Sequence, residues 1–434
     1  MSEASRQIAR QIFHEAMAAA TVDAACSRLL SVRDGTLHAG AYRYDLAAFT
    51  SVQIVSIGKA GATLFEAVRR ILPVGLPVRS VISAPFPPQT LSASDVSFAG
   101  GHPLPNMASL AAAKTALAML RSADEKTLVL FLISGGASAM FEEPIGGAIS
   151  LDDLIEFYRQ LVASGASIQQ VNAVRKHFSA VKGGRLAASA PGATKLTLLI
   201  SDVPADALDA LASGPTLPDS TTLEQTRELI EEFLPSLPAS VRAVIPNLEE
   251  TPKPGDPAFE DAQHLVLLDN AALLEAAKES AERRGFTVVI DNGCDDWDYE
   301  RAATYLLERS AELGRLHKKF CLLSGGEVTV RLPAVSGAGG RNQQLALFAA
   351  LSLPAGTTLL SAGSDGIDGN SVAAGAVVDS TTTLRAQKSN LDPGAALAHF
   401  DSSTLLAALD DTIVTGPSGN NLRDIRILTM GTDT

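Results

Sequence analysis

Two Ser-Gly-Gly sequences in this chain each follow a short apolar run. Residues 130–133 lead directly into Ser134, Gly135, Gly136, Ala137 and Ser138, and residues 320–323 lead into a second copy that ends at Glu327. Because glycine has no Cβ atom, such a turn can bring backbone N–H groups and hydroxyls close to an anion. Each copy taken alone is equally well explained as a tight turn after a strand. Together, the two copies favour a site that binds phosphate groups.

Three charged residues stand where a predicted strand ends or a helix begins. Lys59 follows the apolar run 52–57 and opens a helical pattern, which is the usual place for an anion-binding group. Asp202 follows the run 198–200, where its carboxylate could orient a substrate hydroxyl or hold Mg²⁺. Arg341 comes after a glycine-rich approach and carries a guanidinium that can grip carboxylate or phosphate through two hydrogen bonds. The alternatives are a solvated lysine, an N-cap aspartate and a surface arginine.

Other polar residues are weaker candidates. Glu327 and Asp365 are candidates for binding substrate or a metal, although Asp365, like Asp368, is of a type that favours turns. His102, in a Gly-His-Pro loop, is interpreted as structural. A basic stripe is predicted to be a solvated helix face, with a phosphate contact as the alternative if the helix borders the cleft, and its members are Arg175, Lys176 and Lys182.

The common nucleotide-binding signatures are absent from the sequence. Gly58 and Lys59 form a Gly-Lys pair, but Ala60 follows it and Gln53 stands where the Walker A pattern needs glycine. No G-x-G-x-x-G fingerprint follows a predicted strand, and neither H-E-x-x-H nor a G-x-S-x-G elbow occurs. The remaining candidates for a phosphate-binding site are dispersed charged residues at strand ends.

Composition excludes several classes of protein. A length of 434 residues exceeds what one hydrophobic core usually organises, so we expect two domains. The net charge of −13 argues against a general nucleic-acid binder. The scattered cysteines (Cys26, Cys294 and Cys321) fit a reducing compartment and no metal framework. The N-terminus is polar and no window approaches the roughly 18 apolar residues of a membrane span, so we expect a cytoplasmic protein.

Strand-like and helix-like patterns alternate along the chain, which indicates an α/β fold with a largely parallel sheet. We predict strands at 52–57, 128–133, 196–200, 265–268, 287–290, 320–323 and 358–362. We predict helices at 5–30, 104–120, 151–162, 168–186, 271–283 and 341–351. Ligands sit beyond the carboxyl ends of strands in open α/β sheets, and polar residues follow strands in both halves of the chain. We therefore expect the active site in a cleft between two domains.

Residues 247–257 are rich in proline and charge and lack any periodicity. This composition predicts a solvent-exposed linker. The expected domains are an N-terminal α/β domain at 1–246 and a C-terminal α/β domain at 258–434.

Residues 172–186 resemble the N-A-V-R-K-H-x-S-x-x-K-G-G-R-L block of the type II glycerate kinases, whose relatives carry the hydroxypyruvate reductase names of tartrate operons. The segments 199–204, 212–216, 339–343 and 362–369 are similar to further blocks of the family, in the same order, so the resemblance spans nearly the whole chain. It implies two α/β/α, Rossmann-like domains, the first of glycerate kinase N-terminal type and the second of MOFRL type.

The resemblance also implies a chemistry. It implies ATP- and Mg²⁺-dependent phosphorylation of glycerate, typically at the 2-hydroxyl to give 2-phosphoglycerate, or of a closely related hydroxyacid. By similarity, Lys59 and Arg341 match the cations that bind substrate and phosphate. Asp202 matches the catalytic carboxylate and is the candidate Mg²⁺ ligand. Residues 134–138 match a glycine-rich block near the nucleotide.

Two other functions stay open. One is an NAD(P)H-dependent hydroxypyruvate reductase, against which the missing dinucleotide fingerprint counts. The other is a non-catalytic regulator that binds a sugar acid or phosphate, against which the retention of Lys59, Asp202 and Arg341 counts. We expect a small hydroxyacid as the partner molecule, and neither nucleic acid nor a membrane. A homodimer is compatible with the sequence, which does not fix the oligomeric state.

Overall fold

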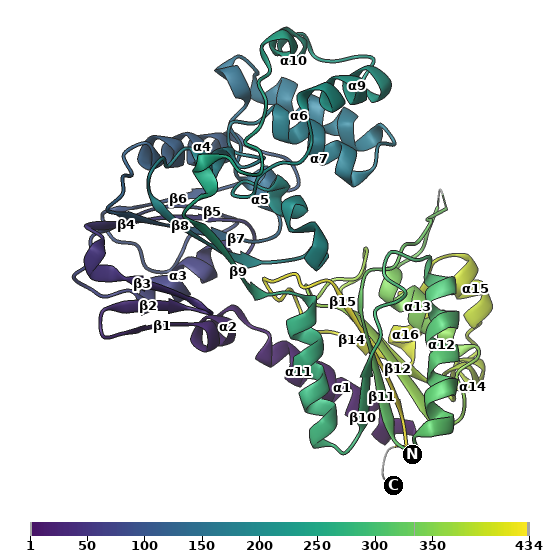
Figure 1. The fold of residues 1–434 in the computed structure, drawn as a ribbon. Helices are drawn as coiled ribbons and strands as arrows, with labels where there is room; N and C mark the ends of the chain where they lie inside the picture. Colours follow the sequence, from purple (N-terminus) through teal and green to yellow (C-terminus); the bar gives the residue numbers. More distant parts are fainter. Residues whose placement is uncertain (1, 334, 432–434) are drawn as a thin grey trace. The chain divides into compact units, whose positions relative to one another are not determined.

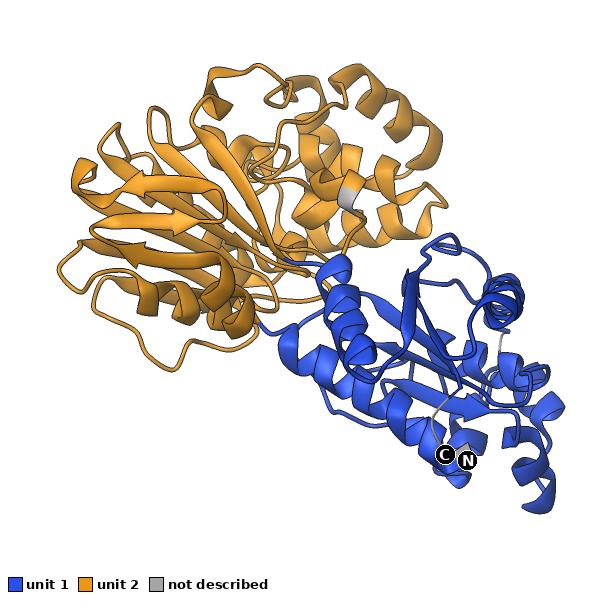
Figure 2. Ribbon diagram, turned by 60° about the horizontal axis from the view of Figure 1, so that its bottom comes forward, with its two compact units in different colours: residues 1–21, 268–434 blue, residues 22–267 orange. Residues whose placement is uncertain are grey.

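The chain forms two compact units in the computed structural model, which describes residues 2–333 and 335–431. Residues 22–267 form one unit, here called the inserted unit, and residues 1–21 with 268–434 form the other, here called the terminal unit (Figure 2). Each unit contains its own six-stranded sheet with helices around it, which confirms the α/β fold class.

The expected boundary at residues 247–257 differs from the one in the structure. The chain passes between the units at residues 21–22 and 267–268. Residues 247–257 instead pack onto the inserted unit, where Leu248 and Thr251 are 5% and 3% exposed. The Thr251 hydroxyl donates a hydrogen bond of 2.9 Å to Asp219. The prolines and charges of this segment thus belong to a surface connection within one unit and do not mark a linker.

The inserted unit is built on a sheet with the strand order β6-β5-β4-β7-β8-β9 (Figure 1). Its strands are β4 (Ser51–Ile57), β5 (Val78–Ala84), β6 (Asp95–Ala99), β7 (Thr127–Ile133), β8 (Thr194–Ile200) and β9 (Ala262–Leu268). Strand β4 pairs in parallel with β5 and β7, and β7 pairs in parallel with β8. The chain runs from β4 outward through β5 and β6, then returns to the other side of β4 at β7. Such a reversal opens a crevice at the carboxyl ends of the two central strands, where ligands bind in open α/β sheets.

Strand β7 shows why this sheet forms. All seven of its residues are buried, as expected for a continuous apolar run that is covered on both faces. Phe131 and Ile133 pack with Val55 and Ile57 in one core cluster.

The helices of this unit are α2 (Val22–Leu29), α3 (Gly61–Ile71), α4 (Met107–Leu120), α5 (Ala137–Met140), α6 (Leu151–Ala163), α7 (Ile168–His177), α8 (Arg185–Ala188), α9 (Leu223–Phe233) and α10 (Ala239–Val244).

Helices α6, α7, α9 and α10 share a second apolar core, which contains Phe157 and Phe178. The single helix expected at 168–186 is two helices, because α7 ends at His177 and α8 begins at Arg185. Gly183 and Gly184, which lie between them, have positive φ angles that a helix does not contain. A small antiparallel sheet completes the unit and consists of β1 (Leu30–Arg33), β2 (Thr36–Ala39) and β3 (Tyr42–Asp45).

The terminal unit is built on a sheet with the order β10-β11-β15-β12-β13-β14. Its strands are β10 (Thr287–Ile290), β11 (Phe320–Gly326), β12 (Thr357–Gly363), β13 (Gly375–Asp379), β14 (Thr412–Ile413) and β15 (Asp424–Met430). Strand β15 lies between β11 and β12 and is antiparallel to both. The expectation of a largely parallel sheet is therefore wrong for this half, since only β10 and β11 pair in parallel among the described strands.

Helix α1 belongs to the terminal unit although it begins the chain. Ile12 and Phe13 of this helix are fully buried, and the helix packs on α11 and β12. The helix expected at 5–30 is therefore divided between the units, with α1 in one and α2 in the other. The helices of the terminal unit are α1 (Ser2–Ala19), α11 (Asn270–Arg283), α12 (Tyr299–Leu316), α13 (Arg341–Ala350), α14 (Thr382–Lys388), α15 (Pro393–Ala398) and α16 (Ser402–Ala408).

Short 3₁₀ helices connect several of these elements. They are Leu46–Ala48, Ile145–Gly147, Ala205–Ser213, Ile245–Asn247 and Pro257–Phe259. Within the described part of the chain, none of the helices has both the length and the apolar composition that crossing a bilayer requires.

Candidate functional site

The first Ser-Gly-Gly turn, residues 134–138, lies beyond the carboxyl ends of β4 and β7. The Ser134 hydroxyl accepts a hydrogen bond of 3.0 Å from the N–H of Ala60, and the Gly135 carbonyl accepts one of 2.9 Å from the N–H of Lys59. These bonds tie the turn to the residues that follow β4. Among the residues that the structure describes, no acceptor faces the N–H groups of Gly135 and Gly136. Both donors are therefore available to an anion.

Two side chains with complementary chemistry flank this turn. A Cβ atom at Gly135 would lie 2.1 Å from Asp202 Oδ2, and one at Gly136 would lie 3.1 Å from Lys59 Cγ. Gly136 also takes a φ of +81°, which side chains rarely adopt. Glycine is thus required at both positions. Lys59 and Asp202 lie around one turn with residues 134–138, and their role as site residues stays a prediction.

His102 lies at the same place, which sequence reasoning missed. A Cβ atom at Gly136 would be 3.1 Å from His102 Cδ2. Burial and the nearby Lys59 charge lower the pKa of His102, so its imidazole is neutral at pH 7. The only signal in the sequence was its position shortly after β6, on the side of the sheet where ligands bind.

The basic stripe is not a solvated face. Lys176 is buried and its Nζ atom lies 2.9 Å from Asp209 and 3.1 Å from Asp219. Lys182 is also buried and forms an ion pair with Glu142. Arg175 lines a cavity whose other walls include His102 and Ser138. The expectation failed because the carboxylates that neutralise these lysines are distant in the sequence.

The second Ser-Gly-Gly is not a turn, because it forms the last three residues of β11 and pairs with β15 through Gly326. The N–H of Gly325 donates to Asn292 Oδ1 at 2.8 Å, and the N–H of Gly326 donates to Asn270 Oδ1 at 3.2 Å. Their carbonyls accept hydrogen bonds from Arg426. The expectation of a second phosphate-binding turn is therefore wrong.

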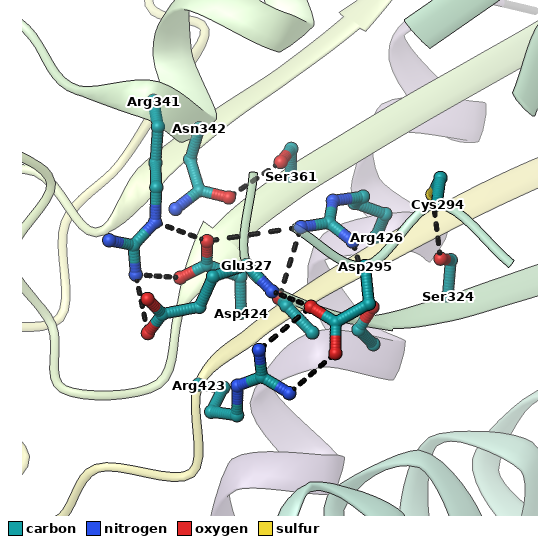
Figure 3. Close-up of polar contacts among 12 residues, drawn as sticks. Cys294, Asp295, Ser324, Glu327, Arg341, Asn342, Ser361, Arg423, Asp424 and Arg426 are labelled. Atoms are coloured by element: carbon teal, nitrogen blue, oxygen red, sulfur yellow. Dashed lines mark hydrogen bonds and ion pairs between the residues drawn. The ribbon is translucent and has the colours of Figure 1, made fainter. Parts of the chain in front are cut away.

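Arg341 begins α13 and lies in a cluster of charged groups (Figure 3). Its Nε and Nη2 atoms donate to the two oxygens of Asp424 at 2.6 and 2.9 Å, and Nη2 also lies 2.8 Å from Glu327. Burial disfavours the charged guanidinium, but the hydrogen bonds and charges of these carboxylates outweigh it and raise the pKa of Arg341. Its Nη1 atom has no hydrogen-bond partner among the described residues and can donate to a ligand.

Neighbouring arginines in this cluster are also paired. Arg423 donates two hydrogen bonds of 2.7 Å to Asp295. The fully buried Arg426 lies 3.9 Å from Asp424. Figure 3 shows the side chains of Arg341 and Arg423 beside the carboxylates that balance their charge.

A cavity of about 520 Å³ lies beside Arg341, and Asp365, Asp368 and Phe400 are among its walls. Asp368 accepts hydrogen bonds from the N–H groups of Asn342 and Gln343 and so caps α13. Its burial raises its pKa to about 6. Asp365 accepts a hydrogen bond of 3.2 Å from the N–H of Ile367, as a turn residue does.

The predicted site residues thus form two groups. Lys59, residues 134–138 and Asp202 belong to the inserted unit, whereas Glu327, Arg341 and Asp365 belong to the terminal unit. A cleft shared by the two groups stays a prediction. No three His, Cys, Asp or Glu residues in the described ranges are arranged to hold a metal ion by themselves.

Comparison with known proteins shows the family. Residues 8–246 match the model of a domain of unknown function, DUF4147, and residues 320–424 match the MOFRL family. A D-glycerate 2-kinase from Thermotoga maritima is 34% identical, with 87% of this chain and 90% of the relative covered. A putative hydroxypyruvate reductase from Agrobacterium vitis is 36% identical, with 87% of each chain covered.

A solved structure supports the same assignment. The crystal structure of a glycerate kinase from Thermotoga maritima matches with a TM-score of 0.87 and 30% identity, and the match covers 99% of this chain and 100% of that one. The fold, the order of the sequence blocks and these similarities agree, and the chain belongs to the type II glycerate kinase family, that of the glycerate 2-kinases.

Proposed function

We propose that this protein transfers the γ-phosphoryl group of ATP to glycerate, at the 2-hydroxyl to give 2-phosphoglycerate, or to a closely related small hydroxyacid. One observation carries the proposal. A cation, open N–H donors and a carboxylate (Lys59, the turn at 134–138 and Asp202) meet where the strand order of the inserted unit reverses. Phosphoryl transfer needs cations and hydrogen-bond donors on the phosphoryl group and a carboxylate near the attacking hydroxyl.

Each group has a role in this reaction. The hydroxyl oxygen of the acid attacks the γ-phosphorus, the bond from that phosphorus to the bridging oxygen breaks, and ADP leaves. Asp202 orients the hydroxyl and accepts its proton. Lys59 and the N–H groups of Gly135 and Gly136 stabilise the charge on the phosphoryl oxygens.

Mg²⁺ fits this site only as an ion that arrives with ATP. Magnesium in phosphoryl-transfer enzymes is held by one or two carboxylates and the phosphates of the substrate. A single carboxylate, Asp202, lies against the turn, and the described residues offer no complete protein cage. Asp202 would hold the ion, and the ion would neutralise phosphate charge.

The residues of the terminal unit complete the proposal. Arg341, with its open Nη1 atom, would bind a phosphate or carboxylate oxygen, and Glu327 and Asp365 would orient hydroxyls or the metal. The cavity beside Arg341, at about 520 Å³, has the size of a small-molecule site. These roles require the site residues of the inserted unit and those of the terminal unit to bind the same ATP and hydroxyacid molecules. The reaction is assigned to the cytoplasm, consistent with three free, buried cysteines.

A reductase is the second candidate, because the strand order of the inserted unit is also that of dinucleotide-binding folds and some relatives carry that name. The glycine fingerprint that such folds use is missing after β4. Oxidation of NADH or NADPH by the purified protein with hydroxypyruvate would favour the reductase.

The test of the kinase is ADP release with ATP, Mg²⁺ and D-glycerate, with the product position read by phosphorus NMR. Turnover should require both the acid and the divalent ion, and equal turnover in excess EDTA would contradict the proposal. Asp202→Asn and Lys59→Met should each lower kcat by about 10²–10³ while the melting temperature changes little. Lys126→Met is the matched control, since Lys126 is exposed at the amino end of β7, and it should retain activity.

A further inference from the structure

Arg175 forms no ion pair with a carboxylate of the described residues. It lies in the last turn of α7 and is half-buried, and no carboxylate of the described residues lies within ion-pair distance of it. Its Nε atom is buried and has no hydrogen-bond partner among those residues. Arg341, Arg423 and Arg426, by contrast, each have a carboxylate within 4 Å. A desolvated charge is costly unless it is paired, so an anionic ligand would complete the surroundings of Arg175.

Arg175 faces a small cavity of about 120 Å³ that adjoins the Ser134–Ser138 turn. His102, Gly136, Ser138 and Tyr158 form other walls, and none of the described lining residues is acidic. The cavity has room for roughly four water molecules at about 30 Å³ each. Drug-sized ligands occupy about 300–1,000 Å³, so a nucleoside would not fit here. A three-carbon acid has the right size.

A buried network holds Arg175 in place. Its guanidinium lies 4.9 Å from the centre of the Tyr158 ring, in a cation–π contact. The Tyr158 hydroxyl donates to Glu142, which also accepts hydrogen bonds from Ser179 and Lys182. Burial and the Glu142 charge hold the pKa of Tyr158 well above its usual value, so the ring stays a neutral phenol. Since Lys182 neutralises Glu142, Arg175 keeps its charge for a ligand.

We propose that Arg175 binds the carboxylate of the hydroxyacid substrate in this cavity, with Tyr158 and Glu142 as positioning residues. The inference rests on the proposed function, because the turn at 134–138 that would carry the phosphoryl group forms one wall of the cavity. An acid held by its carboxylate at Arg175 would present its hydroxyl toward Gly136 and Lys59. The substrate class is therefore a short acid whose hydroxyl is close to its carboxylate.

The first test separates binding of the acid from binding of ATP. Arg175→Gln should raise KM for D-glycerate by about 10- to 100-fold, the loss expected for a charge-assisted hydrogen bond. KM for ATP should stay within about threefold, because the adenosine moiety and its phosphates do not use this cavity. Arg159→Gln is the matched control, since its side chain is 62% exposed on the neighbouring helix α6. A rise in KM for ATP alone, or no change in either, would overturn the inference.

The second test removes the carboxylate from the ligand. Wild-type protein should have a higher kcat/KM for glycerate than for its uncharged amide. In Arg175→Gln the ratio of these two kcat/KM values should fall by the same factor by which KM for D-glycerate rises. Tyr158→Phe should raise KM for glycerate by a few-fold with little change in kcat. Arg175→Lys keeps the charge and should fall between wild type and the glutamine variant. Equal preference for the acid in wild type and Arg175→Gln contradicts the assignment.

A third measurement needs no catalysis. Glycerate alone should raise the melting temperature of the wild type and not that of Arg175→Gln, because a ligand stabilises the folded state it binds. If glycerate stabilises the protein through Arg175 but no phosphoryl transfer occurs, the proposed function fails and the binding site stands. If transfer occurs with the same KM in wild type and Arg175→Gln, the site fails and the function stands.

Discussion

The two Ser-Gly-Gly sequences contain the same residues in opposite surroundings. Strand β7 pairs with β4 and β8 only as far as Ile133, so the glycines that follow leave the sheet with their N–H groups open. Strand β11 keeps pairing with β15 through Gly326, and its glycine N–H groups go to asparagine side chains. The chemistry of so short a motif is thus decided by where the neighbouring strands end.

The sharpest test of this comparison replaces one glycine in each copy. Gly135→Ala would push a methyl group against Asp202 and should lower kcat by about 10²-fold or more, with a small change in melting temperature. Gly325→Ala would place its methyl carbon 1.7 Å from Asn270 Oδ1, so the Asn270 side chain would have to move. The two effects are measured by steady-state kinetics and by differential scanning calorimetry.

The second variant should act on stability. The Asn270 side chain accepts a hydrogen bond from the N–H of Gly326 and donates to the carbonyls of Leu422 and Asp424. Displacing it should break these three hydrogen bonds and lower the free energy of unfolding by about 3 kcal/mol. Asn270→Ala is the control and should show a similar loss of stability with turnover per folded molecule retained. If Gly325→Ala lowered activity without lowering stability, the second copy would be a working part of the site after all.

Arg341→Lys tests whether the charged cluster around Arg341 in the terminal unit acts on the substrate. Lysine cannot reproduce the two-pronged contact with Asp424, so kcat/KM should fall at least about 10-fold, or roughly 1.4 kcal/mol of transition-state stabilisation. Because Asp424 is 1% exposed, losing one of its donors should also lower the melting temperature. Arg159→Lys provides the surface control. An unchanged kcat/KM together with a lower melting temperature would reduce Arg341 to a structural role.

The two serines allow a finer comparison. The Ser134 hydroxyl accepts from Ala60 and donates to Ile57, whereas that of Ser324 lies 3.5 Å from the sulfur of Cys294. Ser134→Ala should destabilise the protein by about 1–2 kcal/mol and Ser324→Ala by less than about 0.5 kcal/mol. Urea unfolding of the two variants measures both values. Equal losses would show that the two serine hydroxyls contribute equally to stability in spite of their different partners.

A further effect concerns the pH dependence of stability. Burial raises the pKa of Asp368 to about 6, above the value near 3.9 of an unfolded chain. The folded state therefore holds a proton that the unfolded state releases, and stability from this group is complete below pH of about 4 and lost as the pH rises through about 6. Asp368→Asn should flatten the curve of unfolding free energy between these values. An unaltered slope in urea titrations would contradict the assignment.

Continuous apolar runs made the central strands predictable. The predicted strands 52–57, 128–133 and 320–323 lie inside β4, β7 and β11, because such runs are stable when both faces of a strand are covered. Strand β15 was not predicted, since Asp424 and Arg426 interrupt its apolar residues. Its antiparallel direction depends on pairing with strands that are distant in sequence.

The candidate site was predictable to a similar degree. Lys59 and Asp202 could be placed near one another from the sequence because each lies two residues after a strand, and strand ends meet at one edge of a parallel sheet. Their catalytic roles stay predictions. The positions of Arg175 and His102 could not be predicted, because they depend on the Glu142 network and on a loop that brings His102 against Gly136. Contacts between residues that are far apart in the sequence produce no motif with a recognisable spacing.

Helix α1 has a consequence for how the chain is made. Its apolar side, which includes the fully buried Ile12 and Phe13, finds its partners in α11 and β12. At a synthesis rate of about 5–20 residues per second, the ribosome needs roughly 12–50 seconds to produce the intervening inserted unit. During that time α1 is an amphipathic helix without a sheet, and β15, the strand between β11 and β12, emerges last of all. The inserted unit can fold during translation, whereas the sheet of the terminal unit can close only after β15 has been synthesised.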